Sequence, residues 1–343
     1  MDKITFTQPD DWHVHLREGD ALNMTVRATA RCFARAIVMP NLSRPIDNII
    51  AANTYRKQIL AALPSGHRFE PLMTLYLTEN LKINDIHNAQ AANIHGVKLY
   101  PKNATTGSAS GIQNIEKVYP ILEAMQQNFL PLLIHGEVTD DTTDVFSRET
   151  VFIDKVLVPL VKHFPKLKIV LEHISTARAV EFILSTPKNV AATITAHHLL
   201  LTRNDLLVGG LRPHHYCLPI VKTEQDKRAL LKAATSGNPK FFLGTDSAPH
   251  PRTSKENACC AAGIFTAHAA IELYAEIFDR AKAMDKLEGF CSFYGADFYG
   301  LPRNRKDITL QRAPWLVPAS IPYQNTQLIP FRAGESVEWK IVT

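Results

Sequence analysis

Eight short apolar runs recur along the chain, and a longer segment with helical character follows each of them. Apolar runs of this length between polar segments are typical of buried strands, whereas the longer segments favour helices. We expect strands at 12–15, 36–39, 72–77, 97–100, 130–135, 169–173, 190–195 and 241–246. We expect helices near 20–34, 48–62, 84–94, 113–128, 149–163, 176–185, 225–235 and 256–281.

Eight strand–helix units in a chain of 343 residues predict an α/β fold, a (β/α)8 barrel of the TIM type, as one domain over residues 1–343. The alternative is a doubly wound open sheet, but no glycine-rich phosphate loop follows the first strand. The polar stretch 102–111 follows the fourth strand and is expected to be an active-site loop. A long connection spans about 197–223, and residues from about 304 to 343 are expected to pack as a C-terminal extension.

Composition narrows the class of protein. The chain is 45% hydrophobic and 21% charged, which is ordinary for a globular protein and excludes a disordered or collagen-like one. Its net charge of +5 comes without a Lys/Arg-rich tract or zinc finger, so we expect no nucleic-acid partner. The most apolar helical stretch, 258–271, is too short to span a bilayer, so no membrane association is expected. The five cysteines lack framework spacing and the N-terminal segment lacks an apolar leader, which favours a cytoplasmic location.

Polar residues stand where the predicted strands end. His13 and His15 lie two apart in the first run, and the two-residue period of a strand places both side chains on one face. The others are Lys98 in the fourth run and His135, His173 and Asp246 at the ends of the fifth, sixth and eighth. The carboxyl ends of the strands form the active site in such a barrel, so we expect these six side chains to converge on one rim.

Imidazole and carboxylate ligands without thiolate suit zinc and similar divalent metals. Six such residues exceed one tetrahedral site and predict a two-metal site, with the ions about 3.5–4 Å apart. Burial lowers the pKa of a lysine, and we hypothesise that neutral Lys98 reacts with carbon dioxide to form a bridging carbamate. Taken singly, each residue has another explanation: a structural histidine, a solvated Lys98, or Asp246 as a turn residue. The joint pattern favours the metal site.

These motifs resemble the amidohydrolase superfamily and, within it, the dihydroorotases of the compact, single-function bacterial type. The order His-x-His, Lys, His, His, Asp on successive strands is the superfamily's pattern. WHVHLREGD at 12–20, MPN at 39–41 and GTDSAPH at 244–250 together are specific to the dihydroorotases. GVKLYP at 96–101, RPHHYCLP at 212–219 and PFRAGE at 330–335 also match, so the resemblance runs from about residue 12 to the C-terminus.

The resemblance implies a distorted barrel that holds two zinc ions, in a homodimer. By position, His13, His15 and Asp246 hold the more buried ion, and His135 and His173 hold the other. Carboxylated Lys98, an N6-carboxylysine, bridges the two ions.

The implied substrate is L-dihydroorotate, a cyclic ureide with one carboxylate, or its open form N-carbamoyl-L-aspartate. A carboxylate calls for a bidentate arginine and nearby donors. By resemblance, Arg17, Asn41 and His250 bind that carboxylate. The remaining implied contacts are backbone groups near Leu218, Ala248 and Ala262, and the hydroxyls of Thr105 and Thr106 on a mobile loop.

Each of these has an ordinary structural explanation as well. Arg17 has Glu18 and Asp20 as possible surface partners, and Asn41 has the composition of a turn residue. His250 is explained equally by a loop position, and the two threonines by a flexible surface turn.

Two adjacent histidine pairs, His197/His198 and His214/His215, stay outside the predicted metal site. Neighbours on an extended strand face opposite ways and do not easily chelate one ion. Cys217 and the Cys259/Cys260 pair are expected to be packing residues.

The resemblance implies hydrolysis of a ring amide, which runs in reverse in pyrimidine biosynthesis. We hypothesise that a metal-bridging hydroxide attacks the carbonyl, while Asp246 takes its proton and returns it to the leaving ring nitrogen. One alternative is another cyclic amidase, such as a hydantoinase or allantoinase. Others are an aldolase barrel whose Lys98 forms a Schiff base, and a non-catalytic scaffold derived from this fold.

Overall fold

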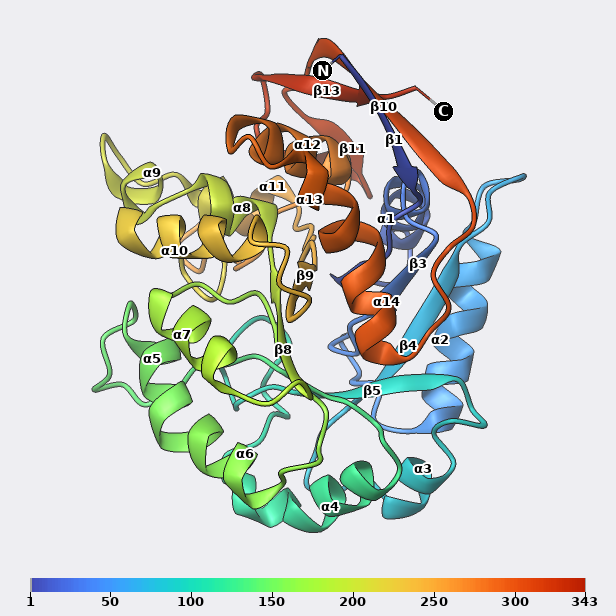
Figure 1. Cartoon of the computed structure of the whole chain (residues 1–343), viewed down its shortest axis with the longest axis vertical. Coiled ribbons are helices and arrows are strands. Elements are labelled where there is room, and N and C mark those ends of the chain that lie inside the picture. The colour runs from blue at the N-terminus through green and yellow to red at the C-terminus, as the bar shows by residue number, and fades with distance from the viewer. Residues whose placement is uncertain (1, 343) are drawn as a thin grey trace.

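Eight parallel strands form the centre of the computed structural model, which describes residues 2–342 (Figure 1). In order around the sheet they are β2 (Asp11–Val14), β3 (Arg35–Val38), β4 (Glu70–Tyr76), β5 (Ile94–Leu99), β6 (Leu132–Ile134), β7 (Ile169–Leu171), β8 (Val190–Ile194) and β9 (Phe241–Leu243). The segment after β9 closes the ring against β2, because the amide of Asp246 donates to the carbonyl of His13 at 2.9 Å. The amide of His15 in turn donates to the carbonyl of Ser247 at 3.1 Å. The predicted barrel is confirmed.

Helices surround the strands (Figure 1). Those between strands are α1 (Ala21–Ala30), α2 (Ile49–Ala61), α3 (Ile83–His87), η1 (Ile115–Val118) with α4 (Tyr119–Gln127), α5 (Arg148–Phe152), η2 (Ile153–Leu157), α6 (Val158–His163), α7 (Ala177–Ser185) and α10 (Glu224–Ala234). Their starts follow local chemistry: the side chains of Asn48 and Thr176 accept backbone amides at the starts of α2 and α7. Thr223 and Asp226 form a capping box at the start of α10.

Two of the predicted helices are longer in the prediction than in the structure. Helix α3 ends at His87, and the expected helix over 256–281 is confined to α12 (Ala270–Arg280). Tertiary hydrogen bonds hold the preceding segment in irregular backbone along the rim. The amide of Ala248 donates to the carbonyl of Ile264 at 2.9 Å, and the Ser247 hydroxyl accepts from the amides of Thr266 and Ala267 at 3.1 and 3.0 Å. These bonds outweigh the helical propensity of the sequence.

The long connection after β8 contains α8 (Ala196–Leu200), α9 (Arg203–Leu207) and the single turn η3 (Pro213–His215). After β9 the chain forms α11 (Arg252–Lys255), α12, α13 (Met284–Glu288), η4 (Gly289–Phe293) and α14 (Tyr294–Tyr299). Helix α14 covers one end of the barrel. Tyr299 stacks on the buried Trp12 with ring centroids 4.6 Å apart, and Gly295 permits the approach because a Cβ there would lie 2.0 Å from the Trp12 ring nitrogen.

The two ends of the chain meet in a small sheet (Figure 1). Strand β1 (Lys3–Thr7) pairs with β10 (Asp307–Leu316), which pairs with β13 (Ser336–Ile341), all antiparallel. The hairpin of β11 (Ile321–Tyr323) and β12 (Thr326–Leu328) completes the C-terminal extension. The single domain over 1–343 remains a prediction. Within residues 2–342, no helix is both long and apolar enough to cross a membrane.

Candidate active site

Three of the six predicted metal ligands converge where β2 and β9 end. The Nε2 atoms of His13 and His15 lie 3.3 Å apart, and Asp246 Oδ1 lies 3.3 Å from the first and 3.1 Å from the second. All three side chains are buried. Asp246 has a left-handed backbone with φ 44°, a conformation that non-glycine residues adopt mainly where tertiary structure imposes it. Three donor atoms this close, from rigid strand ends, could hold one metal ion.

The other three predicted ligands lie on β5 and just beyond β6 and β7. The His173 ring lies 4.9 Å, centroid to centroid, from both the His13 ring and the His135 ring. Lys98 is fully buried on β5. His135 Nε2 donates to Glu137 Oε2 at 2.7 Å, which leaves the lone pair of Nδ1 free for a metal ion. A carboxylate on one ring nitrogen fixes the ring and makes the other nitrogen a better ligand. We call these six residues the metal half of the site.

Glu172 is a member of this cluster that the sequence reasoning missed. Its Oε1 lies 3.1 Å from His13 Nδ1, and its Oε2 contacts the Lys98 ammonium. Strand alternation would turn Glu172 away from the interior if His173 faces inward. However, β7 ends at Leu171 and His173 has a left-handed φ of 43°, so both side chains reach the interior. The sequence signal that could have identified Glu172 is its position directly before the predicted ligand His173.

The electrostatics of the metal half suit divalent ions. Burial lowers the pKa of His15 to about 4 and that of His173 well below its usual value, so both rings are neutral and carry a lone pair. Burial favours neutral Asp246, but His13 and His15 hold the pKa of that carboxyl well below its usual range. Burial also opposes protonation of His13, yet Glu172 and Asp246 raise its pKa to about 9. A divalent ion at Nε2 would take the place of that proton.

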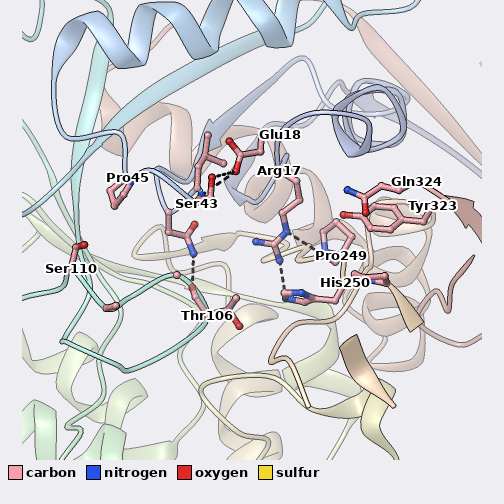
Figure 2. Close-up of a pocket in the computed structure, with 15 residues that line it drawn as sticks. Arg17, Glu18, Ser43, Pro45, Thr106, Ser110, Pro249, His250, Tyr323 and Gln324 are labelled. Atoms are coloured by element: carbon pink, nitrogen blue, oxygen red, sulfur yellow. Dashed lines mark hydrogen bonds between the residues drawn. The ribbon is translucent and has the colours of Figure 1, made fainter. Parts of the chain in front are cut away.

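Arg17, Asn41, Thr106 and His250, which we call the carboxylate half, line a neighbouring cavity of about 350 Å³ (Figure 2). Arg17 donates through Nε to the carbonyl of Pro249 at 3.0 Å, and its Nη2 lies 3.0 Å from His250 Nε2. Burial and the adjacent guanidinium lower the pKa of His250 to about 2, so its ring is neutral. An arginine beside a neutral imidazole is a receptor for an anion.

The surface pairing considered for Arg17 is wrong. Glu18 instead accepts from the amide and hydroxyl of Ser43, at 3.1 and 2.5 Å, as Figure 2 shows. The Tyr55 hydroxyl holds the backbone of Arg17 by donating to its carbonyl at 2.5 Å. The guanidinium is therefore directed into the cavity, with Tyr323 of the C-terminal extension among the residues of the wall.

The loop over residues 102–111 lies on the carboxylate half. Asn41 Nδ2 donates to the carbonyl of Thr106 at 3.0 Å, and the Thr106 hydroxyl lies 3.5 Å from the carbonyl of Ala262. A second, smaller cavity joins the two halves. The predicted site residues that line it are His13, His15, Arg17, Asn41, Thr105, Thr106, His135, His173, Leu218, Asp246, Ala248 and Ala262. The structure therefore brings together every predicted site residue except Lys98, which lies beneath the metal half, and His250, which lines the larger cavity.

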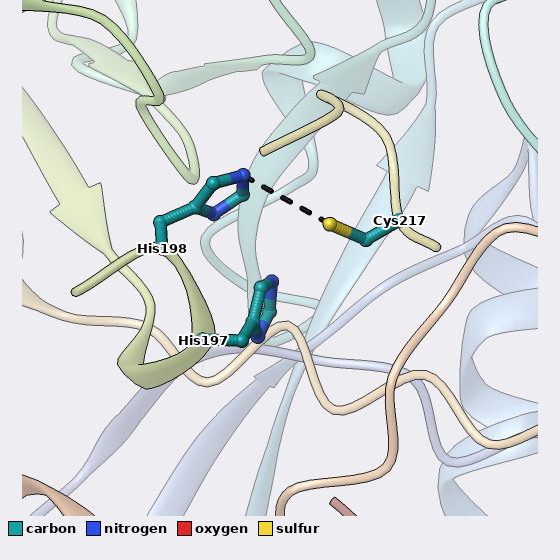
Figure 3. A group of neighbouring side chains, drawn as sticks. All are labelled: His197, His198 and Cys217. Carbon is teal, nitrogen blue, oxygen red and sulfur yellow. Dashed lines mark hydrogen bonds between the residues drawn. The ribbon is translucent and has the colours of Figure 1, made fainter. Parts of the chain in front are cut away.

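The histidine pairs lie outside this arrangement, although the reason given for excluding them is wrong for both, since His214 and His215 lie in the turn η3 and not in extended backbone. His197 and His198 lie on α8 rather than in extended backbone, and Figure 3 shows them beside Cys217. His198 Nε2 donates to the carbonyl of Pro219 at 2.9 Å, and its Nδ1 accepts from the Thr195 hydroxyl at 2.7 Å. Because both ring nitrogens have partners, His198 has no lone pair left for an ion.

The second pair has partners of its own. His214 Nε2 lies 2.9 Å from a carboxylate oxygen of Glu256. His215 Nδ1 donates to the carbonyl of Asp205 at 2.9 Å. These contacts join the turn η3 to α9 and to the end of α11.

Comparison with known proteins identifies the family of this chain. A model of the amidohydrolase family matches residues 6–331. The dihydroorotase of Nitrosococcus oceani is 58% identical over 339 residues, which cover 98% of each chain. The crystal structure of dihydroorotase from Saccharomyces cerevisiae in complex with 5-fluoroorotic acid has a TM-score of 0.92 at 34% identity, with 100% of this chain and 99% of that one covered. Dihydroorotase from Campylobacter jejuni also has a TM-score of 0.92, at 38% identity, with 99% and 98% covered.

Proposed function

This chain belongs to the amidohydrolase family and, within it, to the dihydroorotases, and on that premise we propose how its rim interconverts L-dihydroorotate and N-carbamoyl-L-aspartate. It is a hydrolase that acts on a cyclic amide. The relatives support this activity over the other cyclic amidases, the Schiff-base aldolase and the non-catalytic scaffold. The observation that carries the mechanism is the close approach of His13, His15 and Asp246 beside the Arg17–His250 pair.

Dihydroorotases of this family depend on metal ions. The donor set fits two zinc ions, because it consists of imidazoles and carboxylate oxygen without thiolate. We propose that His13 Nε2, His15 Nε2 and Asp246 Oδ1 hold one ion, and that His135 and His173 hold the other. Bound there, the ions would polarise the ring carbonyl and lower the pKa of water toward neutrality.

Lys98, once modified, would supply a further anionic oxygen ligand to the two ions. It is fully buried, and burial lowers the pKa of its ammonium although Glu172 opposes the shift. The neutral amine forms a nitrogen–carbon bond with carbon dioxide and releases one proton, which gives an anionic carbamate. Carbon-13 NMR of protein grown or equilibrated with labelled bicarbonate tests this step. A carbamate signal that is missing from Lys98→Met supports the modification, and a wild-type protein with two bound zinc ions and no such signal contradicts it.

We assign the substrate carboxylate to the carboxylate half. Arg17 offers paired N–H donors, and Asn41 and His250 offer neutral ones at the same cavity. The hydroxyls of Thr105 and Thr106 would close over the ring from the loop, and the backbone near Leu218, Ala248 and Ala262 would contact ring atoms. Substrate held in this way has its ring amide directed toward the metal half.

Asp246 is the proposed proton carrier. Its Oδ1 faces two imidazoles, so Oδ2 is the atom free to take a proton from the attacking water. The same oxygen then returns that proton to the leaving ring nitrogen as the ring opens. Ring closure follows the same path in reverse, with the proton moving from the carbamoyl nitrogen to Asp246.

Turnover of two ring compounds by the purified protein tests this assignment. L-dihydroorotate carries the carboxylate that Arg17 would bind, whereas dihydrouracil lacks it. We expect turnover of the first and negligible turnover of the second. Equal turnover of both would instead indicate a hydantoinase-like amidase, and labelling of Lys98 by borohydride with a ketone substrate would indicate an aldolase.

A homodimer and a cytoplasmic location are further proposals, which rest on the resemblance to the dihydroorotases. Light scattering on the purified, metal-loaded protein measures the assembly directly. A mass of two chains supports the dimer, and the mass of one chain of 38.3 kDa contradicts it.

A further inference from the structure

Lys255 is a buried lysine whose ammonium holds only backbone carbonyls. It is the last residue of α11, and its side chain is 3% exposed. Its Nζ donates to the carbonyls of Tyr216, Ala261 and Gly263 at 2.8, 2.7 and 2.8 Å. An ammonium has three donors, so all three are used. No acidic side chain of residues 2–342 forms an ion pair with it.

The three carbonyls belong to two loops that line the active site. Ala261 and Gly263 flank Ala262, and Tyr216 lies two residues before Leu218. The loops also bond to each other, because the amide of Gly263 donates to the carbonyl of Tyr216 at 3.0 Å. Leu218, Ala262 and Gly263 line the small cavity together with the metal half. Lys255 is therefore the common attachment point of this wall.

The carbonyl of Ala262 connects this attachment to the carboxylate half. It lies 2.9 Å from His250 Nε2 and 3.5 Å from the Thr106 hydroxyl. Because a carbonyl has two lone pairs, these two donors occupy it, and its orientation sets how His250 and Thr106 face the cavity. Its direction depends on the peptide planes on either side, which are the planes that Lys255 fixes.

We propose that Lys255 is a positioning residue that fixes the Leu218 and Ala262 backbone against which the substrate ring binds. The inference rests on the proposed function, since it takes these two residues as ring contacts. Lys255 itself does not touch the ring. Its loss would therefore weaken the binding of ring ligands and leave the metal half intact.

Lys240 provides a matched control within the same chain. It stands just before β9, away from the carboxyl ends of the strands, and donates to the carbonyls of Ile183 and Thr186 and to the Thr186 hydroxyl. Burial lowers the pKa of both lysines to about 8. Each lysine thus donates to three oxygens without a carboxylate partner, and the two differ in whether the bonded segments line the site.

The test compares Lys255→Met with Lys240→Met in zinc-loaded protein. The probes are dihydroorotate turnover and calorimetric binding of 5-fluoroorotate, the ligand named for the yeast structure. Displacement of the Leu218 and Ala262 backbone would weaken its contacts with the ring. We therefore expect Lys255→Met to raise KM and Kd about 10-fold, while zinc content stays unchanged and kcat changes little. Lys240→Met should lower Tm and leave KM and Kd unchanged. Equal losses in both variants, or no loss in Lys255→Met, would overturn the proposal.

A pH titration of wild-type protein keeps the test valid if Lys255→Met does not fold. The charge of Lys255 is lost as pH rises through about 8, so affinity for 5-fluoroorotate should fall there. The pKa values of Tyr216, Cys217 and Cys260, which face it, are raised, and those of His197 and His250 are lowered. These shifts place the pKa values of these groups away from pH 8. His214 lines a small cavity with Lys255 as well, so the same titration of His214→Gln is the control. An affinity for 5-fluoroorotate that stays constant from pH 7 to 9 would contradict the positioning role of Lys255.

The outcomes also separate this inference from the proposed function. A wild-type protein that neither converts dihydroorotate nor binds 5-fluoroorotate would overturn both. A wild-type protein that does both, with Lys255→Met indistinguishable from it, would overturn the role of Lys255 alone.

Discussion

The metal half and the carboxylate half lie side by side but are built differently. The metal half takes its side chains from β2 and β5 and from the first residues after β6, β7 and β9, whose positions the barrel hydrogen bonds fix. The carboxylate half comes from four separate loops, which follow β2, β3, β5 and β9 and are held by contacts such as Arg17 to Pro249 and Asn41 to Thr106. The barrel thus provides a rigid reaction centre, while loops provide recognition of the substrate.

The two halves also differ in charge. Asp246, Glu172 and Glu137 lie within or against the metal half, where they complement cations. Arg17 lies in the carboxylate half and complements an anion, and Lys255 holds the loop wall next to it. Charges of opposite sign on the two sides orient a ring whose carboxylate is at one end and whose scissile amide is at the other.

The largest effect should follow a change in the metal half. Asp246→Asn keeps the shape of the side chain but cannot carry the proton, so we expect kcat to fall about 10³-fold or more. Zinc content should fall only partly, because the amide oxygen remains a weak ligand. Stopped turnover assays with metal analysis of the same sample measure both. Full activity in Asp246→Asn would show that another group carries the proton.

The carboxylate half should respond in binding rather than in chemistry. Arg17→Ala removes a charge-assisted pair of donors, and we expect KM for dihydroorotate to rise about 100-fold, in line with hydrogen bonds to charged groups. Two bound zinc ions should remain. Steady-state kinetics with metal analysis measure this difference between the halves. Unchanged kinetics would remove Arg17 from the site, and lost zinc would make the division into two halves wrong.

Glu172 tests whether the metal half depends on support from below. Glu172→Gln retains the volume but loses the charge that faces His13 Nδ1, so we expect zinc affinity to fall about 10-fold. Competition with a chelator measures this without any turnover. Glu149→Gln is the matched control, because Glu149 is also buried and accepts from Ser175 and Thr176 instead. If both variants bind zinc as tightly as the wild type, Glu172 does not position the ligand.

The difference between the halves also explains what the sequence could predict. The barrel follows from eight apolar runs, and the candidate ligands were visible because polar residues interrupted or ended those runs. Glu172 could not be identified in this way, because the left-handed backbone at His173 breaks the inward–outward alternation of strand side chains on which the prediction relied. Lys255 has the sequence appearance of a solvated helical residue, and only the folded loops bury it. Likewise, the irregular backbone before α12 depends on long-range bonds to Ser247 and Ala248.

The most direct test of the account is a single titration of the purified, chelator-treated protein with zinc, in which bound metal and dihydroorotate turnover are followed together. We predict that turnover is absent without metal and returns as about two zinc ions bind per chain. Full turnover by the metal-free protein would contradict the account, as would two tightly bound zinc ions that leave dihydroorotate unconverted.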